Sequence, residues 1–178
     1  NLATYTYGEG KDVWLVHHWS KSSCELLPLI RKLGRQGFCV HALDLPAHGG
    51  SEGTHANLIT MSQAFDDFAH ESLMPHTIIT HGLGAAVVAN SSFFSRFSNN
   101  LVMLNPRLNV VEVMKKIAIK NGISERTFKL LLQDIKRRHG KDLSNLNIEK
   151  KITEFSGHVK EVHEKAKLST FSLIKQLA

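Results

Sequence analysis

The sequence predicts an α/β fold: a three-layer, doubly wound, mostly parallel sheet that carries a helical insertion. Two observations support this prediction. Short apolar runs alternate with segments of helical periodicity, which is the pattern of parallel strands joined by covering helices. After Arg107 the alternation stops and helical periodicity alone continues. With 178 residues, 42% of them hydrophobic, the chain has the size of a single domain.

Four strands and three connecting helices are predicted before Arg107. The strands are Val13–His17, Phe38–Leu43, Ile78–Thr80 and Leu101–Leu104, and Asn105-Pro106 ends the last of them. The helices are Cys24–Gln36, with Gly37 placed as its C-cap, Met61–Leu73 and Ala85–Ser95. Such apolar strands fit a sheet that is covered on both faces.

Beyond Arg107 the sequence predicts helices and no convincing strand. Helical periodicity extends over Val110–Lys120, Glu125–His139 and Gly157–Ala166. We expect a single domain over residues 1–178, with a helical insertion at residues 108–147 above the sheet.

Composition argues against several classes of protein. No stretch of about 18 apolar residues is present, so no membrane-spanning helix is predicted. The N-terminus lacks the charged and apolar regions of a signal peptide, and we expect a cytoplasmic protein. Cys24 and Cys39 fit neither a disulfide framework nor a zinc site. The formal charge of +6 arises from clusters without interleaved aromatic residues, so nucleic acid is not an expected partner.

The stretch Thr77–Val88, TIITHGLGAAVV, predicts a strand–turn–helix junction. Such a junction is either a dinucleotide loop, G-x-G-x-x-G, or a nucleophile elbow, G-x-S-x-G. The dinucleotide interpretation is disfavoured because Val87 stands at the third small position. Asn105 also ends the next strand where an acidic residue would bind a ribose. No cofactor is therefore predicted.

Four segments resemble the motifs of the α/β-hydrolase family, in its esterase- and lipase-like branch. HHWS at His17–Ser20 is similar to an HGWS-type loop, and DLPAHGGSEG at Asp44–Gly53 to D-x-P-G/A-H-G-x-S. THGLGA at Thr80–Ala85 is similar to G-H-S-L-G-G, and LVMLNP to the strand that follows it. The resemblance covers Val13–Pro106. It implies the α/β-hydrolase fold with a helical cap after the sixth strand of that fold.

The resemblance also implies where a site would lie. Gly82 takes the nucleophile position, where serine is expected; it suits the sharp turn but has no hydroxyl group. The backbone N–H groups of Trp19 and Leu83 are the implied oxyanion donors. His18 replaces the glycine of the family's loop and is expected to crowd it, and His81 is expected to be a packed neighbour.

In the DLPAHG segment, the resemblance implies a structural role for Asp44, His48 and Gly49. The triad acid and histidine of the family follow two further strands. The sequence displays neither strand, so both roles are unassigned. We expect two stretches of the family pattern to be missing, near Ile148–Lys151 and near Phe171–Ser172.

The remaining titratable residues give no pattern of a reactive site. His158 and His163 are five residues apart, unlike the pair in H-E-x-x-H, so no metal is predicted. Asp66 and Asp67 fall in the middle of a predicted helix, where we expect a solvated face.

Two functions remain open. The first is a carboxylic ester hydrolase type of protein for a small or medium apolar ester, inactive in this chain because Gly82 replaces the nucleophilic serine. The second is a non-catalytic ligand- or partner-binding protein on the same fold. The implied ligand is a small ester-like molecule in the first case.

Overall fold

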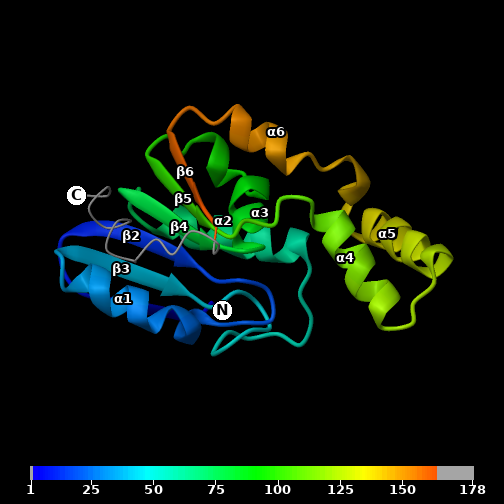
Figure 1. The fold of residues 1–178 in the computed structure, drawn as a ribbon, viewed down its shortest axis with the longest axis horizontal. Helices are drawn as coiled ribbons and strands as arrows, with labels where there is room; N and C mark the ends of the chain where they lie inside the picture. Colours follow the sequence, from blue (N-terminus) through cyan, green and yellow to red (C-terminus); the bar gives the residue numbers. More distant parts are fainter. Residues whose placement is uncertain (1, 164–178) are drawn as a thin grey trace.

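Six strands form one sheet in the order β1-β3-β2-β4-β5-β6 (Figure 1). The structure is a computed structural model and describes residues 2–163. The strands are β1 (Thr4–Tyr7), β2 (Lys11–Val16), β3 (Phe38–Leu43), β4 (Thr77–His81), β5 (Asn100–Leu104) and β6 (His158–Val162). Only β1 runs antiparallel to its neighbour, β3. The predicted mostly parallel sheet is confirmed.

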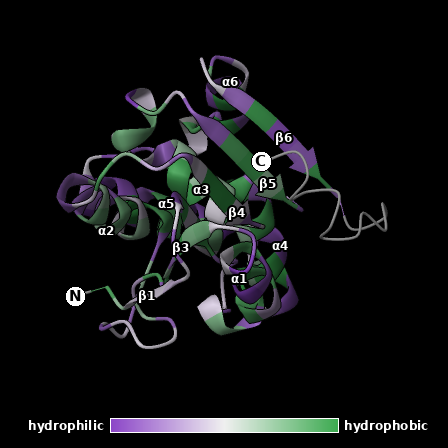
Figure 2. Ribbon diagram, turned by 90° about the vertical axis from the view of Figure 1, so that its left-hand side faces the viewer, coloured by the Kyte–Doolittle hydropathy of each residue, from purple (hydrophilic) through white to green (hydrophobic). Residues whose placement is uncertain are grey.

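Helices cover the sheet on both faces because successive strand residues point to opposite sides. Val13, Leu15 and Val40 face helix α1 (Leu27–Gly34), which a short 3-10 helix, Ser23–Leu26, precedes. Trp14 and Val16 belong to the opposite core, with α2 (Leu58–Glu71) and α3 (Gly84–Asn90). Figure 2 shows apolar residues concentrated on the central strands, between these layers. The three-layer α/β architecture is therefore confirmed.

The sequence analysis was wrong at both edge strands. It missed β1, whose four residues are all exposed. It also predicted a helix at Gly157–Ala166, whereas His158–Val162 forms β6 and pairs in parallel with β5. An edge strand with both faces partly exposed has no strict apolar alternation, so periodicity does not reveal it. Residues 164–166 of that predicted helix lie outside the described residues.

The segment between β5 and β6 is helical, as its periodicity predicts. It contains α4 (Val110–Lys120), α5 (Glu125–His139), a 3-10 helix (Leu143–Asn145) and α6 (Ile148–Thr153). Ser124 caps the start of α5, and Gly140 ends it in a left-handed conformation. The insertion follows β5, the fifth strand of this chain. Figure 1 shows α4 and α5 projecting from one end of the molecule.

Residues near Ile148–Lys151, where a missing stretch is expected, lie in α6, and that expectation stays a prediction. The second expected gap, near Phe171–Ser172, lies outside the described residues. Among residues 2–163, no helix combines the length and the apolar character that crossing a membrane requires.

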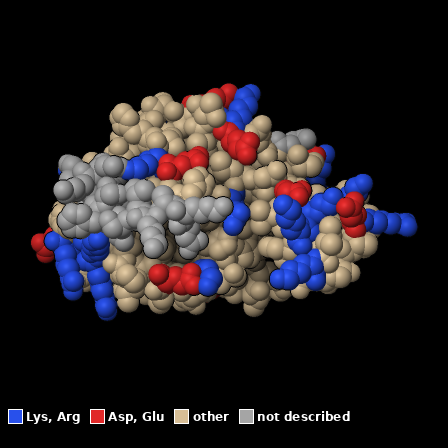
Figure 3. Space-filling view, in the orientation of Figure 1, with Lys and Arg blue, Asp and Glu red and all other residues tan. Residues whose placement is uncertain are grey.

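Charged residues of both signs gather over α4 and α5 (Figure 3). Several of the basic residues form ion pairs with acidic neighbours. These pairs are Lys115–Glu125, Lys116–Glu112, Lys136–Asp142, Arg137–Asp134 and Arg138–Asp134. The basic clusters of the sequence are thus partly neutralised where they fold.

Asp66 has a structural function, although the sequence analysis expected it only on a solvated helix face. The predicted helix Ala85–Ser95 breaks at Ser91, which is extended, and resumes as a 3-10 helix at Phe93–Ser95. The Asp66 carboxylate accepts hydrogen bonds from the N–H groups of Ser92 (2.9 Å) and Phe93 (2.8 Å) at this break. Asp66 therefore ties α2 to the connection that leaves α3.

We expect Asp66→Ala to lower the free energy of unfolding by about 1–3 kcal/mol, because two N–H groups lose a charged acceptor. Asp67→Ala is the matched control; this neighbouring carboxylate is exposed, and we expect a change within about 0.5 kcal/mol. Urea denaturation of both variants measures the difference. Equal effects of the two substitutions would contradict the role given to Asp66.

Candidate functional site

The turn between β4 and α3 is a sharp bend with Gly82 at its apex. Gly82 has φ = +55°, a left-handed conformation that glycine adopts without steric strain. Its N–H donates to the carbonyl oxygen of Leu104 at 2.9 Å, and its carbonyl oxygen accepts from the N–H of Arg107 at 3.0 Å. The bend is thus fixed to the end of β5 and to the loop after it.

Gly84, two residues further on, lets α3 approach the neighbouring strand closely. A Cβ atom on Gly84 would lie 2.7 Å from the carbonyl oxygen of Val16 and 2.8 Å from that of His17. Val16 is the last residue of β2, which pairs with β4, and His17 follows it. The chain leaves β2 toward β3 on one side and leaves β4 toward β5 on the other. The bend therefore lies at the switch point of the sheet, where open α/β sheets bind ligands.

His18, in the loop after β2, fills the space above Gly82. A Cβ atom on Gly82 would lie 2.0 Å from Nδ1 of His18 and 2.7 Å from its Cγ. The same Nδ1 accepts a hydrogen bond from the N–H of Leu83 at 3.0 Å. The imidazole thus occupies the position of a side chain at residue 82 and engages an adjacent backbone donor.

The environment of His18 favours the neutral ring. Burial, and then the charges of His81 and Arg107, lower the pKa of His18 below its ordinary value. Because Nδ1 accepts from Leu83, the ring proton of the neutral form is on Nε2. The His81 ring lies beside it, with the ring centroids 5.6 Å apart. The structure therefore brings Gly82, Leu83, His18 and His81 together.

His17 fixes the loop after β2 through hydrogen bonds of its buried side chain. Its side chain is completely buried, and burial is the main cause of its lowered pKa. Nε2 accepts from the N–H of Leu45 at 2.9 Å, and Nδ1–H donates to the carbonyl oxygen of His18 at 2.7 Å. A protonated His17 would lose its acceptor for Leu45, so the neutral form is part of the fold.

The DLPAHG segment forms a second loop, organised around the Asp44 carboxylate. It accepts from the N–H groups of Ser23 (2.7 Å) and Gly50 (2.8 Å). Burial raises the pKa of Asp44, but these hydrogen bonds outweigh burial, and the pKa lies below its ordinary value. Gly49, with φ = +53°, lies so close that a Cβ atom there would clash with the carboxylate.

His48 joins this loop to the loop after β2. Its Nδ1–H donates to the carbonyl oxygen of Pro46 at 2.8 Å, and its Nε2 accepts from the N–H of Ser20 at 3.1 Å. Both ring nitrogens are used in backbone contacts.

A cavity of about 440 Å³ opens beside these two loops. Trp19 is half-buried at its wall, and His48 and Gly49 line it as well. Its other lining residues are Ser20, Lys21, Ala47, Thr54 and Ala56. Trp19, His48 and Gly49 therefore share one hollow at the loops after β2 and β3.

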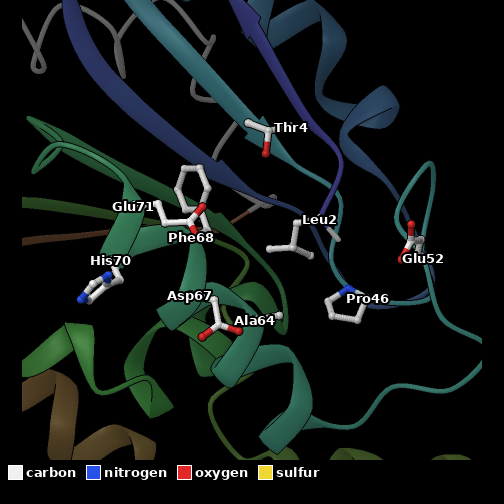
Figure 4. Close-up of a pocket in the computed structure, with 9 residues that line it drawn as sticks. All are labelled: Leu2, Thr4, Pro46, Glu52, Ala64, Asp67, Phe68, His70 and Glu71. Atoms are coloured by element: carbon white, nitrogen blue, oxygen red, sulfur yellow. The ribbon is translucent and has the colours of Figure 1, made fainter.

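A cavity of about 700 Å³ lies elsewhere, between the N-terminal segment and α2 (Figure 4). Leu2, Thr4, Pro46 and Glu52 line one side, and α2 contributes Ala64, Asp67, Phe68, His70 and Glu71. None of the site residues that the sequence predicts lines it. Size alone therefore does not make it the site, because the bend and the predicted residues lie at the strand ends.

Sequence reasoning missed the direct contact between His18 and Gly82 and the part played by the loop after β5. Asn105 there adopts φ = +45°, and its N–H donates to the carbonyl oxygen of Val162 at 2.8 Å. The available signal was that His18 and Gly82 both depart from the family pattern, on loops that leave adjacent strands. Within residues 2–163 we assign no triad acid or histidine.

The fold and the bend define a class: doubly wound α/β proteins with their site on the loops at the switch point. The sequence profile of the alpha/beta hydrolase family matches residues 8–150. The chain belongs to that family.

A curated relative and several solved structures are similar to the chain. The relative is an (E)-2-((N-methylformamido)methylene)succinate hydrolase of Acinetobacter baylyi, 26% identical over 153 residues, which are 86% of this chain and 53% of that protein. The chain thus spans about half the length of this relative.

Two crystal structures resemble the fold. One is a monoacylglycerol lipase of Paleococcus ferrophilus, with a TM-score of 0.64, 16% identity and coverage of 99% of this chain and 98% of that one. The other is an α/β hydrolase fold protein of Burkholderia ambifaria, with a TM-score of 0.58, 20% identity and coverage of 91% and 76%. At these identities the likeness concerns the fold alone.

We expect Gly49→Ala to destabilise the protein by about 2 kcal/mol or more, because the new methyl group adds overpacking to left-handed strain. The clash is with Oδ2 of Asp44, only 1.9 Å from the Cβ position. Gly122→Ala is the control: φ is +79°, and among the described residues no atom lies within 4 Å of a Cβ placed there, so strain alone acts, at about 1 kcal/mol. Thermal or urea unfolding measures both, and a smaller effect at Gly49 would contradict the packing described.

Proposed function

We propose that the chain is a hydrolase-fold protein of the carboxylic ester hydrolase type. With glycine at residue 82, it does not perform serine-hydrolase chemistry. The observation that carries the proposal is the His18 ring in the space that a side chain at residue 82 would need. Gly82 takes the nucleophile position and supplies no hydroxyl group. The N–H of Leu83, an implied oxyanion donor, already donates to His18. The nucleophile is thereby absent, and one of the two implied oxyanion donors is already engaged.

His18 and Gly82, the two departures from the family pattern, depend on each other because side chains at both positions would compete for the same space. A serine at residue 82 needs a small residue at position 18, and an imidazole at position 18 needs glycine at residue 82. Gly82→Ser alone therefore does not rebuild the site. A hydroxyl group fits there only if His18 moves or is replaced.

The ligand class in this proposal is a small or medium apolar ester-like molecule. The similar proteins differ widely in the substrates that their names give. One solved structure is named for an acyl lipid, and the curated relative is named for a succinate derivative. The family alone therefore does not select a substrate. A cytoplasmic location and the absence of a nucleic-acid partner belong to the same proposal. The ion pairs over α4 and α5 support the latter, since they reduce the free positive charge.

A second candidate is a binding protein that retains the pocket without turnover. The cavity of about 440 Å³ at the loops after β2 and β3 favours it, because Trp19 offers an apolar wall next to polar loop atoms. The predicted cap over residues 108–147 would cover such a ligand. Its helices pack on the core through Val110 and Ile135, while Ile117 and Leu131 are exposed.

The coupling predicts a non-additive stability cycle. We expect Gly82→Ser alone to lower the free energy of unfolding by about 2 kcal/mol or more, because its Cβ atom collides with His18. In His18→Gly/Gly82→Ser this clash is absent, so the double variant should be more stable than the sum of the single effects by about 1–3 kcal/mol. Urea denaturation of the four proteins measures the coupling energy.

The matched control combines His18→Gly with Gly122→Ser, since Gly122 has a positive φ and open surroundings. These two effects should add within about 0.5 kcal/mol. Additivity in the Gly82 cycle as well would mean that the imidazole does not compete with residue 82 for space.

Esters of short and medium acyl chain length separate turnover from binding. With p-nitrophenyl esters we expect no stoichiometric burst, because no hydroxyl group stands at the bend. Binding would change the fluorescence of Trp19 but not of Trp14, which is buried, and Trp19→Phe should abolish the change. A burst would overturn the first proposal, and a silent Trp19 at saturating ligand would overturn the second.

A further inference from the structure

Three potential metal ligands meet near the start of β2 and β3, at the end of these strands away from the bend. In the parallel register Asp12 lies opposite Cys39, and His41 is two residues beyond Cys39 on the same face of the sheet. Each offers one ligand atom, and these atoms all lie within 4.8 Å of one another. We propose that Asp12, Cys39 and His41 form a Zn²⁺ site.

One of the ligand distances matches a tetrahedral ion, a second is slightly short, and the third pair lies within 4.8 Å. With Zn–N and Zn–O bonds near 2.0–2.2 Å and Zn–S near 2.3 Å, two ligands of one zinc ion lie about 3.3–3.7 Å apart. The distance from Sγ of Cys39 to Nε2 of His41 is 3.5 Å. Nε2 of His41 and Oδ1 of Asp12 are 2.8 Å apart, the distance of a hydrogen bond. The carboxylate needs to move by only about 0.6 Å to make room for the ion.

Thr6, on the neighbouring strand β1, orients the imidazole of His41. β1 pairs with β3 so that Thr6 stands opposite His41. Oγ1 of Thr6 lies 3.2 Å from Nδ1 of His41. When Nδ1–H donates to this hydroxyl oxygen, Nε2 carries its lone pair toward Asp12 and Cys39. Metal-bound histidines are held in this way, through the ring nitrogen that does not bind the ion.

Binding replaces protons that the ligands carry without the ion. The proton between Nε2 of His41 and Asp12 leaves, and so does the thiol proton of Cys39, so that one imidazole, one thiolate and one carboxylate hold the ion. Burial, and then the charge of Asp12, raise the pKa of the Cys39 thiol. A coordinated cation reverses this effect, because it stabilises the thiolate directly.

The ligand set selects the ion. One nitrogen, one sulfur and one oxygen ligand suit Zn²⁺, whereas Ca²⁺ and Mg²⁺ require oxygen ligands throughout. All three side chains are partly exposed, which leaves a fourth position for water. The site joins β2 and β3, with Thr6 of β1 supporting it. Zn²⁺ bound there would stabilise this edge of the sheet.

Cobalt(II) provides a direct test, because thiolate coordination gives a ligand-to-metal absorption band. Titration of the reduced full chain with Co²⁺ should give this band at one equivalent, and Zn²⁺ should remove it by displacement. Cys39→Ser should abolish the band, while Cys24→Ser, at the other, exposed cysteine, should retain it. Thr6→Val should weaken Co²⁺ affinity about 10- to 100-fold while the band remains.

The melting temperature gives an independent readout. Zn²⁺ at a hundredfold excess over its Kd should raise Tm by about 5–10 °C in the unmodified chain and in Cys24→Ser, but not in Cys39→Ser. Circular dichroism checks that each variant is folded. No thiolate band at millimolar Co²⁺, or a band lost in Cys24→Ser and kept in Cys39→Ser, would overturn the proposal.

Discussion

The volume above Gly82 is the constraint on which the site depends. At this point the backbone of β4 turns into α3, and the position of a Cβ atom on residue 82 is within 2.0 Å of the His18 ring. The His18 ring and a side chain at residue 82 cannot both occupy that space. Because the left-handed backbone of the bend favours glycine, the competing imidazole has been accommodated without strain in the turn. The hydrogen bond from Leu83 then fixes the ring where it stands.

The surrounding loops keep their form by backbone contacts that need no reactive side chain at the bend. His17 joins the loop after β2 to Leu45, His48 joins it to Pro46, and Asp44 closes the loop that contains Gly49. These contacts involve buried or half-buried groups with satisfied hydrogen bonds, and such groups are strongly held. The form of these loops is therefore independent of the residue at the apex of the bend. This explains how the fold persists in a chain whose bend carries glycine.

The parts of the fold that the sequence predicted are those in which burial determines the pattern. β2 to β5 are apolar because helices cover both faces, and α4 and α5 show helical periodicity because one face packs inward. β1 and β6 escaped prediction because an edge strand needs only hydrogen bonds to its one neighbour. The sharp bend at Gly82 was predicted from its motif. The contact of His18 with it was not, since it depends on the direction of a side chain from another loop.

The cluster of Asp12, Cys39 and His41 illustrates the same limit of linear patterns. Asp12 and His41 are 29 residues apart in the chain and meet only because β2 and β3 pair in parallel in one register. A shift of that register by one residue would turn one strand's ligands to the opposite face. No metal was predicted from the spacing of His158 and His163 along the chain. That spacing gives no information about ligands that meet across paired strands. The bend lies at the carboxyl end of the strands and the cluster near their start, so residues at one end can change without altering the contacts at the other.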